Sequence, residues 1–109
     1  GKLSSIVLHY NSIEGSIPTE LAVLSMLSDL RLSNNKLGGT IPADLWSLTG
    51  MRTLHLNDNQ LTGNLSNDVG RFSNLMDLQL HDNSFSGSLP SEVWSLTSLK
   101  GLGVQNNSF

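Results

Sequence analysis

Hydrophobic positions recur along the whole chain with one spacing. Segments with the pattern LxxLxL begin at Leu3, Leu27, Met51, Leu75 and Leu99, and the interval between successive starts never changes. Four complete units result, 3–26, 27–50, 51–74 and 75–98, followed by a partial unit, 99–109. Periods of roughly 20 to 50 residues are typical of solenoids, in which stacked coils bury a core that one coil cannot bury alone. The sequence therefore predicts a single repeat segment, 1–109, and its uncapped pattern at both ends predicts a piece of a longer array.

The LxL part of each unit predicts a strand, because apolar and variable positions alternate with the period of a sheet that has one buried face. Five parallel strands are expected, centred on 6–8, 30–32, 54–56, 78–80 and 102–104. Later apolar pairs, such as Leu45 and Leu48, are three residues apart and predict a short helical return segment with one inward face. The predicted fold is an α/β repeat solenoid with a concave parallel sheet and helical or 3-10 segments on its convex side.

The constant spacing also assigns structural roles to polar residues. A side-chain amide has both a donor and an acceptor, so an asparagine after each strand can satisfy the backbone of its own and the adjacent coil. The expected ladder consists of Asn11, Asn35, Asn59, Asn83 and Asn107. Glycine at 15, 39, 63 and 87 indicates a tight bend in each full unit.

The return segments have their own signals. Proline precedes three of them and suits a helix start, as does the acid that follows two residues later in all four units. Ser66 replaces the fourth proline and predicts a locally altered start. Trp46 and Trp94 follow inward-facing positions in two of these segments. We interpret both as amphipathic rings that cover the convex side. A ligand site near them, on the convex or lateral side, is the alternative to a site on the concave face.

Composition narrows the function classes. The net charge is −3, so no basic footprint indicates a nucleic acid partner. No apolar run approaches about 18 residues, so this segment is not expected to contact a membrane. The chain has no cysteine, which excludes disulfides and thiolate metal sites within it. Nothing in the sequence calls for a cofactor.

The turn motifs carry a family resemblance. Residues 13–18 read IEGSIP, 37–42 read LGGTIP, 85–90 read FSGSLP, and 61–66 form the variant LTGNLS. With the 24-residue period, these resemble the plant-type leucine-rich-repeat family, which includes ectodomains of receptor-like kinases, receptor-like proteins and polygalacturonase-inhibiting proteins. The resemblance covers essentially the whole chain. It implies a right-handed superhelix, a short second sheet near the GxI residues, and an extracellular or cell-surface setting. No kinase motif occurs in this chain, so kinase activity would belong to another part of a parent protein.

Function in such a solenoid is expected at the variable strand positions, which alternate with buried leucines and have no core role. These positions are polar and favour a protein, peptide or glycan ligand. The predicted ligand-binding residues on the concave face are Arg31, His55, Asp77, Gln79, His81 and Asp82. Arg31 is the expected anchor for a carboxylate or sulfate, because its planar group can donate two parallel hydrogen bonds. No metal site is predicted. The histidines on this face point to solvent, and nothing in the sequence requires their ring nitrogens to converge on one ion. An oriented base and an oxyanion hole are also missing, so an enzyme is not predicted.

Two glycosylation sequons begin at Asn64 and Asn106. Asn64 is the glycosylation candidate, whereas Asn106 ends a concave strand and is expected to stay unmodified. The favoured function is a recognition module in the ligand-binding region of a receptor-like protein or receptor kinase, with a co-receptor as a further partner. The alternative is a soluble secreted inhibitor of an enzyme such as a cell-wall polygalacturonase. An intracellular scaffold is the third interpretation.

Overall fold

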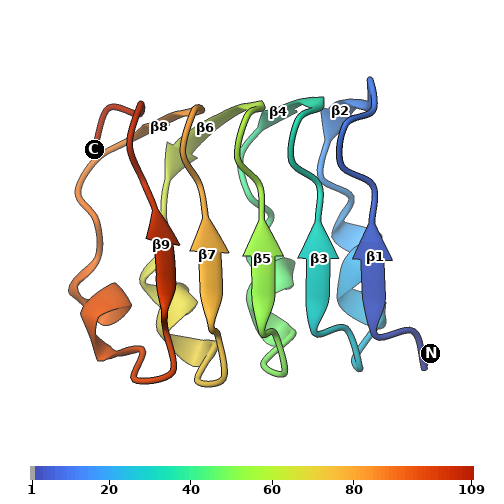
Figure 1. Cartoon of the computed structure of the whole chain (residues 1–109), viewed down its shortest axis with the longest axis vertical. Helices are drawn as coiled ribbons and strands as arrows, with labels where there is room; N and C mark the ends of the chain where they lie inside the picture. Colours follow the sequence, from blue (N-terminus) through green and yellow to red (C-terminus); the bar gives the residue numbers. More distant parts are fainter. Residues whose placement is uncertain (1) are drawn as a thin grey trace.

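The structure is a computed structural model that describes residues 2–109, and it shows one coil per repeat unit (Figure 1). The first strand of each coil joins a five-stranded parallel sheet: β1 (Ser5–Val7), β3 (Asp29–Arg31), β5 (Thr53–His55), β7 (Asp77–Gln79) and β9 (Gly101–Gly103). The predicted five parallel strands are therefore confirmed, although each lies one residue earlier than expected. The reason is visible at Leu56, whose carbonyl accepts from Asn59 and Asn83 instead of the next strand. The asparagine side chains take over the hydrogen bonding where the sheet ends.

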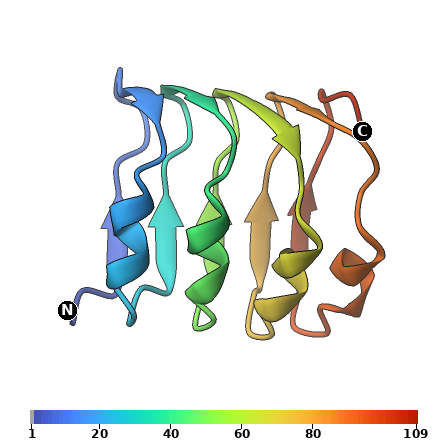
Figure 2. The ribbon, with the colours of Figure 1, turned by 180° about the vertical axis from the view of Figure 1, so that it is seen from behind.

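A second parallel sheet follows the turn in each full coil. It contains β2 (Glu14–Ser16), β4 (Lys36–Gly39), β6 (Gln60–Asn64) and β8 (Ser84–Ser86). In the first sheet Ser5 pairs with Asp29, its equivalent in the next repeat unit. In the second sheet Glu14 pairs with Lys36 and not with Gly38, which is its equivalent in the next unit. The lateral strands are thus offset by two residues per coil, and they run obliquely across the stack (Figure 2).

Each chain return is a short 3-10 helix on the side opposite the first sheet (Figure 2). The four helices are η1 (Thr19–Val23), η2 (Ala43–Ser47), η3 (Asn67–Arg71) and η4 (Ser91–Ser95). An acidic residue stands in the first turn of each: Glu20, Asp44, Asp68 and Glu92. None of the helices within 2–109 is long and apolar enough to cross a membrane.

The helix start at Ser66 was expected to differ from the others, and that expectation is wrong. Ser66 has φ −69° and ψ 145°, close to the values of Pro42. Its hydroxyl accepts a hydrogen bond from the Asp68 backbone N–H at 3.0 Å. Serine therefore adopts the same backbone geometry as proline by acting as a side-chain cap, because its oxygen satisfies a free N–H in the first turn.

The core lies between the two sheets and the helices. Inward leucines from the strands and apolar pairs from the helices form one continuous cluster, to which Ile17, Leu27, Leu54, Leu78 and Val93 belong. Most of these side chains are fully buried in the central coils, where a neighbour lies on either side. The first coil is more open, and its inward leucines Leu3 and Leu8 remain almost half exposed. Burial thus depends on stacking rather than on any single coil.

Trp46 and Trp94 do not behave alike, which corrects the sequence interpretation. Trp46 is only 2% exposed and packs against Phe72, with ring centroids 5.2 Å apart. Trp94 is 68% exposed. The positions are equivalent in sequence, but Trp46 is covered by the neighbouring coils, so it is a core residue. Only Trp94 keeps the predicted surface position.

An asparagine at each turn connects neighbouring coils. Asn59 donates to the carbonyls of Leu56 and Asn57 in its own coil and of Leu32 in the preceding coil. Its carbonyl oxygen accepts from the backbone N–H of Leu37 at 3.0 Å. The same pattern holds at Asn35, Asn83 and Asn107, whereas Asn11 bonds only within its own coil. No buried side-chain nitrogen or oxygen in the described residues lacks a partner.

Glycine is required where coils approach closely. Gly63 has φ +86°, a backbone conformation that L side chains rarely adopt. A Cβ atom there would also lie 2.8 Å from Cγ2 of Thr40 in the preceding coil. Gly15 has a similar φ of +90° but nothing within 4 Å of its Cβ position. The bend alone therefore demands glycine, and the stacking of coils adds a second demand at Gly63.

Candidate ligand-binding face

The solvent side of the five-stranded sheet carries the predicted site residues, and we call it the concave face. Arg31 in β3, His55 in β5, and Asp77 and Gln79 in β7 all lie on it, half-buried between their neighbours. His81 and Asp82 follow β7 in the adjoining turn. Strand pairing places His55 beside both Arg31 and Gln79. The fold thus brings the predicted residues onto one surface over three consecutive strands.

Asp77 is the centre of a hydrogen-bonded group on this face. Its Oδ2 atom lies 2.7 Å from Nε2 of His55, and its Oδ1 atom accepts from the side chain of Gln79 at 2.7 Å. Partial burial opposes ionisation of Asp77, but the hydrogen bonds from Gln79 and His55 outweigh it and lower the pKa of the carboxyl. Three side chains from β5 and β7 are therefore held in one arrangement before any ligand binds.

Arg31 is less free than the sequence suggested. Its Nε atom donates to Oδ1 of Asp29 at 2.8 Å within the same strand. The hydrogen bond to Asp29 is the main cause of the raised pKa of Arg31. One edge of the guanidinium is thus occupied by the protein itself. Asp29 was outside the predicted site, although its position two residues before Arg31 on an alternating strand would place both on the same face.

A second polar group occupies the turn after β7. His81 Nδ1 lies 2.6 Å from Oδ2 of Asp82, and the side chain of Asn106 donates to Oδ1 of Asp82 at 2.7 Å. These hydrogen bonds, with that of His81 the larger effect, lower the pKa of Asp82. Asn106 was not among the predicted site residues, yet it connects this group to the last coil.

Backbone conformation explains why this turn position is polar. Asn34, Asp58, Asp82 and Asn106 all have φ between 57° and 59°, and Tyr10 has φ 56°. Asparagine and aspartate adopt this left-handed region more readily than other residues with a side chain. The sequence analysis placed Asp82, one of these residues, among the ligand-binding positions. The repeated Asn or Asp at a 24-residue spacing was the signal of a structural requirement.

The last strand lacks side chains on the concave face because its outward residues are Gly101 and Gly103. A Cβ atom on Gly101 would lie 2.5 Å from Oδ1 of Asp77, and one on Gly103 would overlap the side chain of Gln79. Asp77 and Gln79 therefore lean over β9, where only glycine leaves room for them. This arrangement lets both carboxylate oxygens of Asp77 accept hydrogen bonds.

Asp58, His81 and Asp82 are the residues within 2–109 whose ligand atoms gather closely enough to hold a metal ion, all within 4.8 Å of one another. Asp58 and Asp82 come together because they occupy equivalent turn positions in adjacent coils. Their oxygens already accept from Asn57, Asn106 and His81. The internal hydrogen bonds account for this group without an ion.

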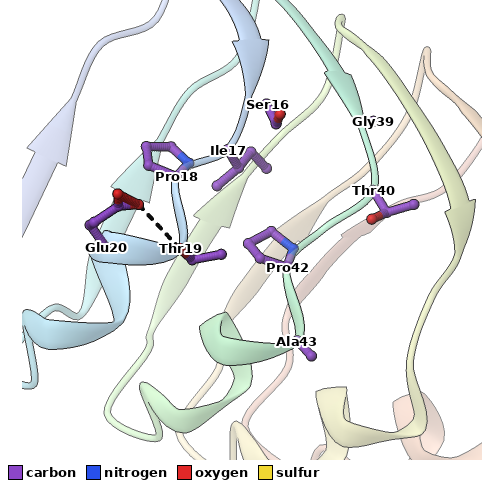
Figure 3. Close-up of a pocket in the computed structure, with 9 residues that line it drawn as sticks. All are labelled: Ser16, Ile17, Pro18, Thr19, Glu20, Gly39, Thr40, Pro42 and Ala43. Atoms are coloured by element: carbon purple, nitrogen blue, oxygen red, sulfur yellow. Dashed lines mark hydrogen bonds between the residues drawn. The ribbon is translucent and has the colours of Figure 1, made fainter.

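A large hollow lies on the lateral side, between the first two coils, with a volume of about 730 Å³ (Figure 3). Pro18 and Pro42 stand on its two sides, and the Thr19 hydroxyl is hydrogen-bonded to Glu20 at 3.1 Å. Residues of both coils line it, among them Ser16 from the first and Thr40 from the second. Its lining residues bring together few hydrogen-bonding groups and a single charge, so it is less suited to specific recognition than the concave face.

Comparison with known proteins places this surface in context. The sequence model of the Leucine Rich Repeat family matches residues 2–24, 26–48, 50–72 and 74–96. A search of curated proteins gave no match. Among solved structures, the chain is similar to the ectodomain of the plant membrane receptor kinase GASSHO1/SCHENGEN3 from Arabidopsis thaliana in complex with CASPARIAN STRIP INTEGRITY FACTOR 2. The identity is 35% and the TM-score 0.93, over 97% of this chain and 13% of that one.

Two further solved structures show the same similarity. The Arabidopsis receptor kinase HAESA ectodomain, in complex with an IDA peptide hormone ligand, is 38% identical with a TM-score of 0.92, over 97% of this chain and 18% of that one. The BIR3–SERK2 complex from Arabidopsis thaliana is 34% identical with a TM-score of 0.93, over 97% of this chain and 57% of that one. The chain therefore spans between about an eighth and just over half of these relatives. Its repeats, its two parallel sheets and these similarities show that it belongs to the leucine-rich-repeat family, in the form found in plant receptor ectodomains.

Proposed function

We propose that this chain is a ligand-recognition segment of an extracellular receptor ectodomain and that it binds a peptide on its concave face. The observation that carries the proposal is the preformed group around Asp77, in which His55 and Gln79 are held by hydrogen bonds of 2.7 Å each. None of these three side chains contributes to the core, and all three point to solvent from adjacent strands. Rigid polar groups of this kind lower the entropic cost of binding.

The similarity to the HAESA ectodomain, which was solved with a peptide hormone ligand, favours a peptide over other ligand classes. It also favours an extracellular location and a co-receptor as a second partner. The role proposed for this segment is binding without catalysis. No observation favours the secreted-inhibitor alternative, and a lateral site built on both tryptophans is disfavoured because Trp46 is buried.

The experiment is a selection from a displayed peptide library on the 109-residue chain, followed by affinity measurement on variants. The test variant combines His55→Ala, Asp77→Asn and Gln79→Ala. The control variant combines Trp94→Ala and Asp44→Asn, both exposed on the helical side. Selected peptides should lose about tenfold or more in affinity for the test variant, since several hydrogen bonds to charged or buried groups are lost, and keep their affinity for the control.

The opposite pattern would contradict the proposal. If the selected peptides bind the test variant unchanged while the control variant abolishes binding, recognition occurs on the helical side. Circular dichroism of both variants shows whether the fold is retained, so loss of binding is not confused with unfolding.

A further inference from the structure

A shallow hollow at the edge where the concave strands begin is lined by two basic residues and no acidic one. Its volume is about 250 Å³, and it is lined by Arg52, Asn74, Met76, Ser98 and Lys100. We call it the strand-start hollow. Arg52, Met76 and Lys100 immediately precede β5, β7 and β9, so they occupy equivalent positions in three consecutive coils. The starts of these strands lie along the lower edge of the sheet in Figure 1.

Backbone hydrogen bonds hold these positions side by side. The N–H of Met76 donates to the carbonyl of Arg52 at 2.8 Å, and the N–H of Lys100 donates to that of Met76 at 2.8 Å. The two cationic residues therefore stand on either side of one methionine. The stacking of the coils sets the distance between the backbones of Arg52 and Lys100. Both side chains are long enough to lean toward the space between them.

The hollow has the composition of an anion site. Within the part of the chain that the structure describes, Arg52 and Lys100 form no ion pair, unlike Arg31. No acidic residue lines the hollow, although the whole chain has nine acids and six basic residues. The nearest acid along the chain, Asp77, is engaged by His55 and Gln79 on the concave face. Two unpaired positive charges thus face one space in a protein with a net negative charge.

The remaining lining residues add hydrogen bonding and an apolar surface. Asn74 and Ser98 offer amide and hydroxyl donors at the same unit position in adjacent coils. Met76 is 39% exposed and forms the apolar part of the lining. Pockets for whole small ligands usually measure about 300–1,000 Å³, so this hollow fits one side chain or one chain end.

We propose that the strand-start hollow binds the carboxylate of a peptide ligand, held between Arg52 and Lys100 with donors from Asn74 and Ser98. The proposal rests on the proposed function, because it takes the ligand to be a peptide. Arginine suits a carboxylate through its two parallel donors, and lysine adds a mobile point charge. The hollow lies directly before β7 and β9, so it adjoins the edge of the concave face on which the peptide is proposed to bind.

The test uses small probes and therefore does not depend on the natural ligand. Backbone amide signals of the ¹⁵N-labelled chain are followed by NMR at constant ionic strength during addition of N-acetylglycine, which carries a terminal carboxylate. A second titration uses the N-acetyl, N-methylamide derivative of aspartate, which carries only a side-chain carboxylate. N-acetylglycinamide is the neutral control. Saturable shifts at Met76, Ser98 and Lys100 are expected with a carboxylate probe and not with the amide.

Substitutions then assign the effect to the two charges. The variant Arg52→Gln/Lys100→Gln should weaken binding of the probe by about tenfold, because each exposed charge pair is worth up to a few-fold in affinity. The matched control is Arg71→Gln/Lys36→Gln, which removes the same charges from exposed positions elsewhere. The control should bind the probe as the unchanged chain does.

Three outcomes would overturn the proposal: equal shifts with the neutral amide, unchanged binding by Arg52→Gln/Lys100→Gln, or non-saturating shifts spread over all basic residues. The last would indicate general anion screening only. Comparison of the two carboxylate probes shows whether a chain end or an acidic side chain fits better. Failure here leaves the concave-face proposal standing, because that proposal is tested through His55, Asp77 and Gln79.

Discussion

The imidazole of His55 and the carboxylate of Asp77 lie 2.7 Å apart across the boundary between two coils. They belong to adjacent strands, β5 and β7, and neither takes part in the apolar core. The contact is therefore a link between coils made on the ligand-facing surface. Any change in the charge of Asp77 acts both on stacking and on the shape of the concave face.

Stability is expected to fall in acid through Asp77. Its pKa is lowered in the folded chain because the hydrogen bonds from Gln79 and His55 outweigh the opposing effect of burial. A carboxyl with a lowered folded-state pKa stabilises the fold at pH above its ordinary pKa, and this contribution disappears as pH falls through the folded-state value. Urea midpoints should therefore decrease below about pH 4.

The Asp77→Asn variant should show a smaller decrease over that range, because the titrating group is gone. Asp44→Asn, at an exposed helix start, is the control and should keep the full decrease. Identical pH profiles for Asp77→Asn and the unchanged chain would show that this hydrogen-bonded group does not affect folding.

The asparagine ladder is predicted to matter most in the interior. Asn59→Ala should lower the free energy of unfolding by about 1–3 kcal/mol, because backbone groups of Leu32, Leu37 and Leu56 lose a partner. Asn11→Ala should cost less, since Asn11 is exposed and bonds only to its own coil. Urea denaturation of both variants measures the difference, and an equal loss at the two positions would contradict the ladder's role between coils.

Alanine substitutions at two glycines distinguish the energetic cost of backbone strain from the cost of a steric clash. Gly15→Ala should cost about 1–2 kcal/mol, because alanine disfavours the positive φ and meets no neighbour. Gly63→Ala should cost more, because its Cβ also meets Cγ2 of Thr40 at 2.8 Å. Adding Thr40→Ser removes that methyl group and should recover part of the loss. If the second substitution recovers nothing, the contact with Thr40 is not the source of the extra cost.

Glycosylation is predicted at Asn64 and not at Asn106 when the chain is secreted from plant cells. Asn64 is exposed at the end of β6, away from the concave face, and its side-chain nitrogen donates no hydrogen bond among the described residues. Asn106 donates to Asp82, and a glycan there would cover the proposed binding surface. Peptide mapping before and after glycosidase treatment tests this, with Asn64→Gln and Asn106→Gln as paired variants. Loss of glycan mass in Asn106→Gln alone would reverse the assignment.

The sequence predicted the fold well because the repeat multiplies weak local signals. The alternation in LxL at a fixed spacing identifies the strands and their parallel order, since successive coils must stack alike. It could not separate Trp46 from Trp94, because these occupy equivalent positions and differ only in which coils cover them. Nor could it show that Ser66 reproduces the proline geometry through a hydrogen bond.

Prediction of the site was partial for a similar reason. Periodicity placed His55, Asp77 and Gln79 on one face, but pairwise contacts depend on rotamers and on neighbouring side-chain size. The lean of Asp77 over Gly101 and the engagement of Arg31 by Asp29 follow from such details. The strand-start hollow lies at positions that the repeat pattern leaves unspecified, so its basic character appears only when the coils are stacked.

The two sheets differ in the register between neighbouring coils. In the first sheet Ser5 pairs with Asp29, its equivalent in the next unit, whereas in the second sheet Glu14 pairs with Lys36, two residues before its equivalent. Since each register is the same at every coil, duplication or deletion of one whole unit preserves every type of contact between neighbours. A single-residue insertion in β5 would instead exchange inward and outward side chains in that strand and break its alignment with β3 and β7. Such a chain can therefore evolve by gaining or losing whole coils, and its ligand-binding surface can change by point substitution. Insertions of single residues are tolerated only in the turns.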